Sequence, residues 1–437
     1  MNLYSTNHVS PNVGIEEAIF RGLPPDNGLY MPMEFTPLPA SFFETIEERS
    51  MQEIAFAVSK AIIGDAVSDH DLKQIVDSSI NFDAPLLEIE DNIFSLELFH
   101  GPSMAFKDFG ARFMAALMSH FLGKKQQNIH ILVATSGDTG GAVAQGFFGS
   151  KNIDVTILYP SGKVSDIQEK QLTTLGENVK ALEVNGTFDD CQKLVKEAFL
   201  DAELTDKFTL ASANSINIAR LIPQSFYYMV TYARLKKYGL PIVFSVPSGN
   251  FGNLTAGVMA HRLGMPVAAF IAATNLNNVV PTYLSSGDYE PISPSVSTIS
   301  NAMDVGNPSN FPRLKAMFHN DLEALQAKVK GCFYDDEQTR TAMQAIYKQT
   351  GYVCCPHTAI AYLGLHDYLK TQTEPTLGVF LATAHYAKFL PEVEPTLGQK
   401  VKIPERLSAL LSLEKIATPM STNYADFKAW LMDNLGK

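Results

Sequence analysis

The 437-residue sequence contains few cysteines, and none of the four belongs to a C-x-x-C pair. Cys354 and Cys355 are adjacent, which is a poor geometry for an ordinary disulfide, and Cys191 and Cys332 stand far from them and from each other. This usage is typical of a reducing compartment, so we expect a cytoplasmic protein. Residues 1–7 carry neither a basic nor an apolar stretch, so we expect no signal peptide.

Long runs of one residue class are also missing. No apolar run approaches the length of a membrane span, so no membrane association is expected. No basic run or stripe appears, and the net charge is -12, so a nucleic-acid partner is not expected. An acidic protein can still bind an anionic ligand, but only through a few well-placed Arg, Lys and backbone N–H groups. No metal site is expected.

A dinucleotide fingerprint is missing as well. Residues 135–141 (TSGDTGG) follow a buried strand candidate and precede a helix, but they do not match G-x-G-x-x-G. The next strand ends in residues 159–163 (YPSGK), which include no acidic residue to bind a ribose. We therefore discount NAD as a ligand.

What the sequence does contain is a regular alternation of strand and helix patterns, in a composition that is 46% hydrophobic and 18% charged. Such alternation predicts βαβ units and an α/β fold with parallel sheets. Residues 1–85 read as mostly helical, and residues 291–312, rich in Ser, Asn and Pro, as a long ordered loop or lid. The strand candidates are 93–99, 129–134, 154–159, 179–184, 208–211, 242–246, 267–273 and 376–382.

One strand end has the composition of a phosphate site. Residues 248–253 (SGNFGN) follow the strand candidate 242–246 and precede a helix. The two glycines let the backbone approach a ligand, and the helix N-terminus offers free N–H groups. The alternative is an ordinary strand-to-helix turn that uses Gly and Asn for left-handed conformations.

Two other strand ends are polar. Residues 135–141 offer hydroxyl and N–H groups at a helix N-terminus, which suit a carboxylate or a phosphate. Residues 382–385 (ATAH) end the last clear strand, although a Thr at such a place is usually just a β-former. Ligands of open α/β sheets bind at these carboxyl ends, so the three loops are candidate site segments.

Lys107 lies near the start of a predicted helix, 103–122, that is apolar on nearly every face. A helix of this kind is buried, and burial lowers the pKa of a lysine and favours the amine that forms a Schiff base. The alternative is a lysine at a frayed helix start that reaches water, paired with Asp108. The phosphate loop favours the first interpretation, because a buried amine and a phosphate site are what pyridoxal 5'-phosphate (PLP) requires.

Several motifs, in order along essentially the whole chain, resemble the threonine synthase family. Residues 100–110 (HGPSMAFKDFG) are similar to its cofactor-lysine motif, and the length and N-terminal extension resemble the bacterial and fungal form. The other matching stretches are 28–32 (GLYMP), 135–141 (TSGDTGG), 215–220 (SINIAR), 301–311 (NAMDVGNPSNF) and 383–389 (TAHYAKF).

The resemblance implies the tryptophan synthase β-like PLP fold, fold type II. It implies conversion of O-phospho-L-homoserine and water to L-threonine and phosphate, the last step of threonine biosynthesis, by a lyase. It implies three regions: a helical segment over 1–85, a smaller α/β region over 86–235 that holds the lysine and a mobile substrate-binding part, and a larger α/β domain over 236–437 that holds the phosphate loop. It also suggests a monomer.

The resemblance further implies roles for individual residues. Lys107 would bind PLP as a Schiff base, and Thr383 would hydrogen-bond the pyridine nitrogen. The cofactor phosphate would be bound by Gly249, Asn250, Phe251, Gly252 and Asn253. The substrate carboxylate would meet Ser136, Asp138 and Thr139. The substrate phosphate would meet Ser215, Asn217 and Arg220, with Asn250 shared.

The sequence departs from the family pattern at two places. Related PLP enzymes often have Asn where Asp138 stands, and the family usually has Pro where Tyr386 stands. Two further interpretations stay open: another fold type II enzyme, such as a threonine dehydratase or a β-replacing synthase, which would not need a second phosphate pocket, and a non-catalytic phosphate- or nucleotide-binding protein. The sequence assigns no role to Cys354, Cys355, His357 or Lys388.

Overall fold

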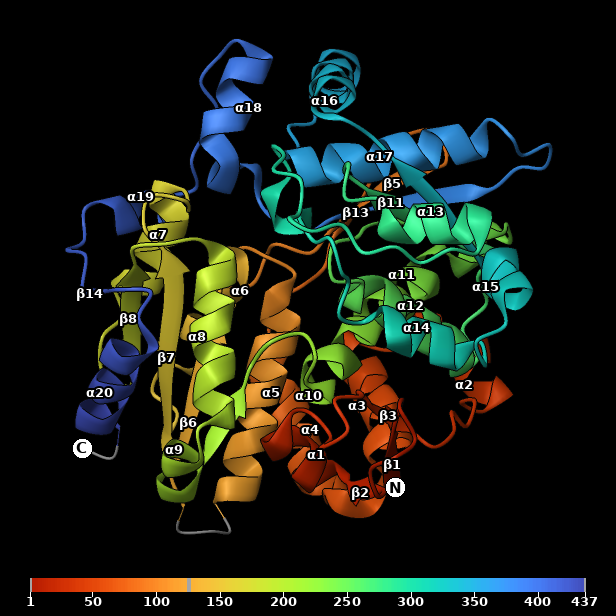
Figure 1. The fold of residues 1–437 in the computed structure, drawn as a ribbon. Helices are drawn as coiled ribbons and strands as arrows, with labels where there is room; N and C mark the ends of the chain where they lie inside the picture. Colours follow the sequence, from red (N-terminus) through yellow and green to blue (C-terminus); the bar gives the residue numbers. More distant parts are fainter. Residues whose placement is uncertain (1, 124–126, 436–437) are drawn as a thin grey trace.

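A computed structural model describes residues 2–123 and 127–435 of the chain. Two large sheets dominate it, one on each side of Figure 1, with helix α5 (Lys107–Leu122) running between them. This is the predicted α/β architecture of fold type II. Among the described residues, no helix is both long and apolar enough to cross a bilayer.

The larger sheet has six strands in the order β12-β11-β10-β13-β5-β4. All neighbours pair in parallel except β4 and β5, which are antiparallel. Its central strands are buried along their whole length, as expected of a parallel sheet covered on both faces. The strands are β4 (Leu86–Glu90), β5 (Ile93–Glu97), β10 (Ile242–Pro247), β11 (Ala269–Thr274), β12 (Val329–Phe333) and β13 (Leu377–Ala382).

The smaller sheet has five parallel strands in the order β14-β8-β7-β6-β9. Its edge strand β14 comes from the C-terminal end of the chain, just as β4 and β5 precede the rest of the larger sheet. Each sheet therefore contains strands from both sides of the predicted boundary between residues 235 and 236. The three domain ranges stay a prediction. The strands are β6 (Ile129–Ala134), β7 (Ile153–Pro160), β8 (Val179–Val184), β9 (Leu210–Ser212) and β14 (Thr418–Met420).

The N-terminal region contains a small antiparallel sheet, β2-β1-β3, that the helical reading of residues 1–85 did not include. Residues 40–63 form three separate helical pieces, and the last and longest of them begins at the Ser50–Glu53 capping box. The elements are β1 (Asn2–Ser5), β2 (Val13–Gly14), α1 (Ile15–Arg21), β3 (Tyr30–Pro32), α2 (Ala40–Glu44), η1 (Ile46–Glu48), α3 (Met51–Ile63), η2 (Gly64–Ala66) and α4 (Asp69–Ser79).

The remaining helices cover the two sheets. In Figure 1, α8 lies in front of the smaller sheet and α17 lies across the top of the larger one. Those between β6 and β10 are α6 (Asp138–Phe147), α7 (Asp166–Thr173), α8 (Phe188–Leu200), α9 (Ala202–Lys207), α10 (Ile218–Leu221), η3 (Ile222–Ser225), α11 (Phe226–Leu235) and η4 (Lys236–Tyr238). Those after β10 are α12 (Gly252–Arg262), α13 (Val279–Ser286), η5 (Asn301–Met303), α14 (Phe311–Met317), α15 (Leu322–Lys328), α16 (Asp336–Thr350), α17 (Pro356–Leu369), η6 (Tyr386–Phe389), α18 (Leu390–Leu397), α19 (Glu405–Leu411) and α20 (Tyr424–Asn434).

Helix α5 begins four residues later than its apolar pattern predicts. Residues 103–106 form an irregular turn, in which Met104 has a positive φ of 55°. The side chain of Asp108 accepts a hydrogen bond from the Ser103 N–H at 2.9 Å and so ends the turn. The helix then starts at Lys107, so the lysine is the first residue of the helix and does not lie in its interior.

Candidate active site

The start of α5 is joined to the end of β13. The Phe106 N–H donates to the Thr383 carbonyl at 2.8 Å, and the His385 N–H donates to the Met104 carbonyl at 3.1 Å. Thr383 itself is 6% exposed. These bonds bring Lys107 and Thr383 together at the carboxyl end of the larger sheet, where ligands of such sheets bind.

Lys107 is largely buried, with 18% of its side chain exposed. Burial lowers its pKa to about 8, with Lys388 and Arg220 adding to the effect and Asp138 opposing it. The Nζ atom lies 4.0 Å from the Asp138 Oδ2, which is longer than a hydrogen bond. Lys107 is therefore an amine that loses its proton unusually easily, as a Schiff-base lysine must.

Residues 249–253 have the geometry of an anion cradle. Phe251 adopts a left-handed φ of 63° and caps α12, which begins at Gly252. The Asn253 side chain donates to the Pro247 carbonyl at 2.9 Å and closes the loop. Within the described residues, the N–H groups of 249–253 form no hydrogen bond with the chain. They are free to bind a phosphate at a helix N-terminus.

The phosphate loop lies beside the Ser215 segment. Asn250 Oδ1 accepts hydrogen bonds from the N–H and hydroxyl of Ser309, at 3.3 and 3.0 Å. The neighbouring Asn310 donates from its side chain to the Ser215 hydroxyl at 3.2 Å. A Cβ on Gly252 would lie 3.8 Å from the Ser215 Cβ. Two segments that the sequence assigns to two different phosphates are thus neighbours.

Arg220 is 2% exposed and faces α5, where a Cβ on Gly110 would come within 2.7 Å of its Nε. Burial lowers its pKa to about 10, and Asp108 opposes the shift. One guanidinium nitrogen donates to the Ala213 carbonyl, whereas Nε has no partner among the described residues. A buried guanidinium with no carboxylate partner among the described residues fits an anionic ligand.

Asn217 caps α10 instead of pointing a free amide at the site. Its Nδ2 donates to the Ile19 carbonyl at 2.8 Å and to the Ser212 carbonyl at 3.2 Å. Its Oδ1 accepts from the Ala219 N–H at 3.1 Å. Both amide N–H groups of Asn217 are used in these bonds, so direct phosphate binding by Asn217 stays a prediction. The bonds that the structure shows hold the Ser215–Arg220 segment in place.

The loop after β6 is held by the Thr135 hydroxyl, which accepts from the N–H groups of Gly137 and Gly140 at 3.0 and 2.8 Å. Ser136 and Thr139 are partly buried on this loop, and Asp138 begins α6. Burial alone would raise the pKa of Asp138, but Lys388 and Lys107 beside it hold that pKa well below its usual range.

Three buried residues of the site were not assigned from sequence: Arg313, Lys388 and His357. Arg313 has no carboxylate partner among the described residues. It donates to the Tyr30 carbonyl at 3.0 Å and the Ile216 carbonyl at 2.7 Å. It thereby fixes α14 to the N-terminal region and to the Ser215 segment. Burial lowers its pKa to about 9.

His357 connects α17 to the predicted loop over 291–312. Its Nε2 accepts the Ala302 N–H at 3.2 Å, so that nitrogen carries no proton. Burial lowers the pKa of His357 to about 4, Asp138 opposing and Lys107 adding to the effect. A Cβ on Gly249 would come within 2.9 Å of the Ala302 carbonyl. The loop is therefore packed directly against the phosphate cradle.

Tyr386, which departs from the family pattern, does not disrupt its turn. Residues Tyr386–Phe389 form the 3-10 helix η6, capped by the His385 side chain, which accepts from the Ala387 N–H at 3.1 Å. Lys388 of this turn points inward and is fully buried.

The donors fit PLP. The amine of Lys107, the free N–H groups of 249–253 and the hydroxyl of Thr383 match the aldehyde, phosphate and pyridine nitrogen of that cofactor. Residues 2–123 and 127–435 contain no cluster of His, Cys, Asp or Glu that could hold a metal ion.

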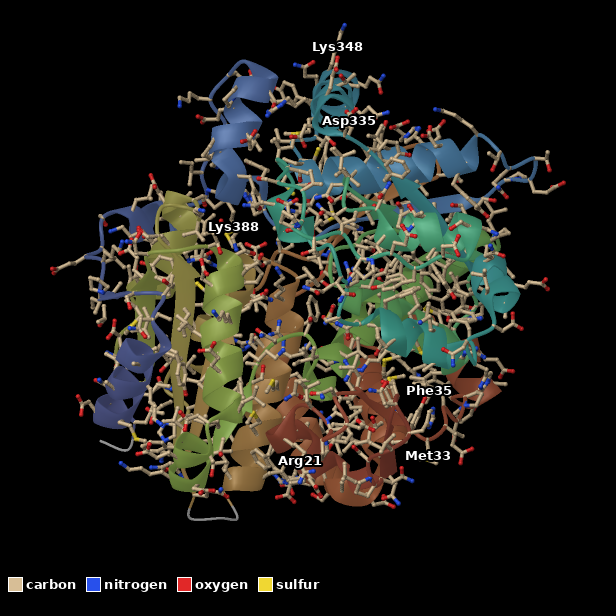
Figure 2. The ribbon with its side chains drawn as sticks, in the orientation of Figure 1. Arg21, Met33, Phe35, Asp335, Lys348 and Lys388 are labelled. Carbon is tan, nitrogen blue, oxygen red and sulfur yellow. The ribbon has the colours of Figure 1, made fainter. Side chains whose placement is uncertain are left out.

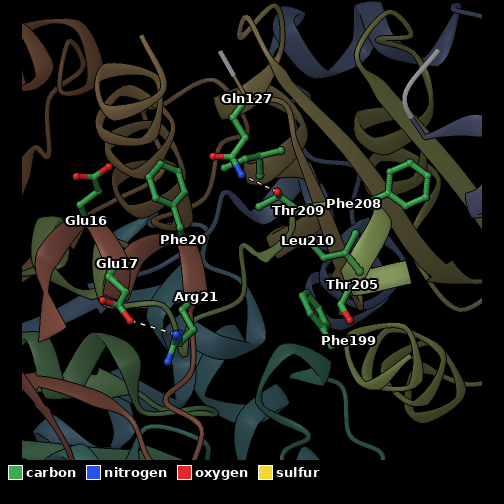
Figure 3. Close-up of a pocket in the computed structure, with 11 residues that line it drawn as sticks. Glu16, Glu17, Phe20, Arg21, Gln127, Phe199, Thr205, Phe208, Thr209 and Leu210 are labelled. Atoms are coloured by element: carbon green, nitrogen blue, oxygen red, sulfur yellow. Dashed lines mark hydrogen bonds and ion pairs between the residues drawn. The ribbon is translucent and has the colours of Figure 1, made fainter. Parts of the chain in front are cut away.

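Two hollows on the molecule are separate from these donors. The one in Figure 3, about 810 Å³, lies between α1 and the start of β9 and contains the Glu17–Arg21 ion pair at 3.1 Å, but none of the predicted site residues. The other, about 820 Å³, lies between α7 and α18, and Lys388 is one of the residues that line it.

Three family models match successive parts of the chain. One described as "Threonine synthase N terminus" matches residues 2–80, one described as "Pyridoxal-phosphate dependent enzyme" matches 82–382, and one described as "Threonine synthase, C-terminal" matches 358–430.

Individual proteins match over the whole length. The threonine synthase of Haemophilus influenzae is 44% identical over 437 residues, covering 99% of this chain and 100% of its own. A crystal structure of threonine synthase from Escherichia coli superposes with a TM-score of 0.91 at 40% identity, covering 99% of this chain and 100% of its own. A crystal structure of PLP-bound threonine synthase from Brucella melitensis gives a TM-score of 0.94 at 32% identity, with full coverage of both chains.

Proposed function

The chain belongs to the threonine synthase family of PLP-dependent enzymes, and we propose that it converts O-phospho-L-homoserine and water to L-threonine and phosphate. The observation that carries this proposal is the adjacency of two anion sites: the free N–H groups of 249–253, and the Ser215–Arg220 segment joined to them through Asn310. A fold type II enzyme acting on an unphosphorylated amino acid needs only the first.

Lys107 performs the proton transfers. When bound, PLP supplies an electron sink that acidifies the Cα–H of the amino acid attached to it. Lys107, whose pKa lies near 8, takes the Cα proton as an amine and afterwards carries protons at Cβ and Cγ. Lys388, the other buried lysine beside Asp138, is not free for this role, because its Nζ is bonded to Asp138 and to the Ser103 carbonyl.

Departure of phosphate from Cγ requires positive charge and N–H donors around its oxygens. Arg220, with its unused Nε, and the hydroxyl of Ser215 supply these from one side of the site. Ser136 and Thr139, at the N-terminus of α6, bind the substrate carboxylate. Thr383 donates to the pyridine nitrogen as a neutral group, which does not fix a proton there and so disfavours transamination.

Water must be kept out until the leaving group has gone, and must then add at Cβ. We propose that the smaller sheet with its loop 135–141 closes over the substrate. We also propose a monomer in the cytoplasm. The cysteine usage, with all four thiols free, supports the compartment.

The test compares two products. Purified protein is assayed for phosphate release from O-phospho-L-homoserine and for 2-oxobutyrate formation from threonine. We expect phosphate release to dominate, and Lys107→Ala to abolish it together with the visible absorption of bound PLP. Lys73→Ala, an exposed lysine on α4, is the control and should change neither. Dominant 2-oxobutyrate formation would identify a dehydratase, and the absence of any PLP band would identify a non-catalytic binding protein.

A further inference from the structure

Lys388 is the most completely buried lysine of the site. None of its side chain is exposed, and its Nζ donates to the Asp138 Oδ1 at 2.7 Å and to the Ser103 carbonyl at 2.9 Å. Its own carbonyl accepts a hydrogen bond from the Ser165 hydroxyl at 2.9 Å. One residue of η6 therefore contacts the start of α6, the turn before α5 and the start of α7. Figure 2 labels Lys388 where the left and right halves of the molecule meet.

The two oxygens of Asp138 have different partners. Oδ1 accepts from Lys388 and, at 3.0 Å, from the Gln168 side chain. Oδ2 faces Lys107 but stays 4.0 Å from its Nζ. Gln168 is 2% exposed and its side chain packs directly against Gly137, where an added Cβ would lie only 2.6 Å from it. The carboxylate is thus held through Oδ1, the oxygen that does not face Lys107, and makes no direct hydrogen bond with Lys107.

This arrangement balances the buried negative charge of Asp138. A buried carboxylate with no other partner would pair with Lys107, raise the pKa of that amine and keep it protonated. A buried carboxylate without any cation would be strongly unfavourable. A second lysine on the far oxygen removes both difficulties, because the Asp138–Lys388 pair is neutral overall.

We propose that Lys388 is a positioning residue of the active site, which binds Asp138 so that the carboxylate does not capture Lys107. This rests on the proposed function only in taking Lys107 as the cofactor lysine. The charged groups that face Lys107 are Asp138, Lys388 and Arg220, and His357 faces it as a neutral ring. Asp108, also buried, interacts electrostatically with Arg220 and with Lys388.

The first test is a double-mutant cycle on the protein freed of PLP. Lys388→Met leaves Asp138 buried with Lys107 as its only cation, and we expect a clear fall in Tm. Asp138→Asn combined with Lys388→Met removes both charges, and we expect it to recover most of that loss. If Lys388→Met does not fold, a soluble double variant supports the proposal equally. A double variant that is no more stable or soluble than Lys388→Met overturns it.

The second test measures Lys107 itself. The rate at which PLP-free protein forms the visible PLP band is followed against pH. In Lys388→Met the midpoint of this profile should move to higher pH by about one unit or more, because Asp138 then pairs with Lys107. In the double variant the midpoint should return toward that of the wild type. An unmoved midpoint in Lys388→Met would mean that Lys388 is merely structural, and would contradict the proposal.

A matched control is the exposed pair Lys73–Asp77, at 3.2 Å on α4. The variants Lys73→Met, Asp77→Asn and their combination should show no coupling in Tm and an unchanged PLP profile. The two proposals fail separately. The stability cycle needs no cofactor and tests Lys388 by itself, whereas wild-type protein that forms the PLP band but releases no phosphate from O-phospho-L-homoserine refutes the proposed function alone.

Discussion

The backbone N–H of Phe106 donates to the carbonyl of Thr383 at 2.8 Å, and the residue after Phe106 is Lys107, the proposed cofactor lysine. The bond uses the main chain on both sides, so the Thr383 hydroxyl and the Lys107 amine stay free for a ligand. It also ties the first turn of α5 to the end of β13. The backbone of Lys107 is therefore held beside that of Thr383 without the use of either side chain.

Thr383→Val separates these two roles. Valine keeps the shape and the carbonyl, so we expect unchanged Tm and retained PLP. It removes the hydroxyl, so phosphate release from O-phospho-L-homoserine should fall by about tenfold or more. Steady-state kinetics and the visible spectrum check this. Thr373→Val, at an exposed threonine in the segment before β13, is the control and should leave turnover, Tm and PLP binding unchanged. Full turnover in Thr383→Val would show that the hydroxyl is not used.

Arg220→Lys tests the substrate-phosphate site. Lysine keeps a charge but loses the planar fork and the unused Nε. We expect KM for O-phospho-L-homoserine to rise by about tenfold, with the PLP band retained. Arg340→Lys, a partly exposed arginine paired with Glu392, is the control. Loss of PLP with normal KM would place Arg220 at the cofactor instead.

Gly249→Ala tests the phosphate cradle. Its new Cβ would lie 2.9 Å from both the Ala302 carbonyl and the Met303 Cα, which are backbone atoms and cannot simply rotate away. Overpacking of this kind should weaken PLP binding by about ten- to a hundredfold. Equilibrium dialysis of PLP measures it. Gly14→Ala, where no atom lies within 4 Å, serves as the control. Equal PLP affinities in the two variants would contradict the assignment.

His357→Gln tests the acid sensitivity of the loop on the cradle. The folded-state pKa of His357, about 4, lies below the ordinary histidine value. Between these two values the unfolded chain binds a proton that the folded protein does not, so lowering the pH destabilises the fold. At pH 5 this histidine should cost about 2 kcal/mol relative to pH 7. Glutamine can accept the Ala302 N–H and does not titrate.

The comparison with the variant is needed because other buried groups titrate in the opposite direction. Burial raises the pKa of Asp108 and of Asp304 to about 6. Because the folded protein binds these protons more readily than the unfolded chain, both groups increase the stability of the fold as the pH falls. These groups are common to both proteins and cancel in the difference. Denaturant unfolding at pH 7 and pH 5 should show the smaller acid loss in His357→Gln. Equal losses in the two proteins would exclude His357 as the source.

Much of the fold is readable from local patterns. The strands β6 and β8 have the predicted bounds, 129–134 and 179–184. The start of α5 is not readable in this way. The apolar pattern continues through residues 103–106, but their backbone groups bond to the end of β13, and that competing partner lies far away in the sequence.

The site residues also differ in whether a local sequence signal marks them. Lys107 and Gly249 are marked by local signals, an apolar helix and a glycine pair after a strand. Lys388, His357 and Arg313 are polar residues whose partners come from distant segments, so nothing beside them reveals a role. One hint existed for Lys388, which stands between the apolar residues Ala387 and Phe389 shortly after a strand end. Burial could have been suspected there, although not its partner.

Strand β14 gives the chain an order of assembly. It pairs with β8 through Thr418–Met420, and Phe427 and Leu431 of α20 are fully buried against the same sheet. A ribosome makes these residues after all the other strands of both sheets. Until they emerge, the outer edge of β8 has no neighbour and part of the apolar face beneath it is bare, which invites pairing with other chains. A nascent or truncated chain is therefore an aggregation risk even after Lys107 and its partners have been synthesised.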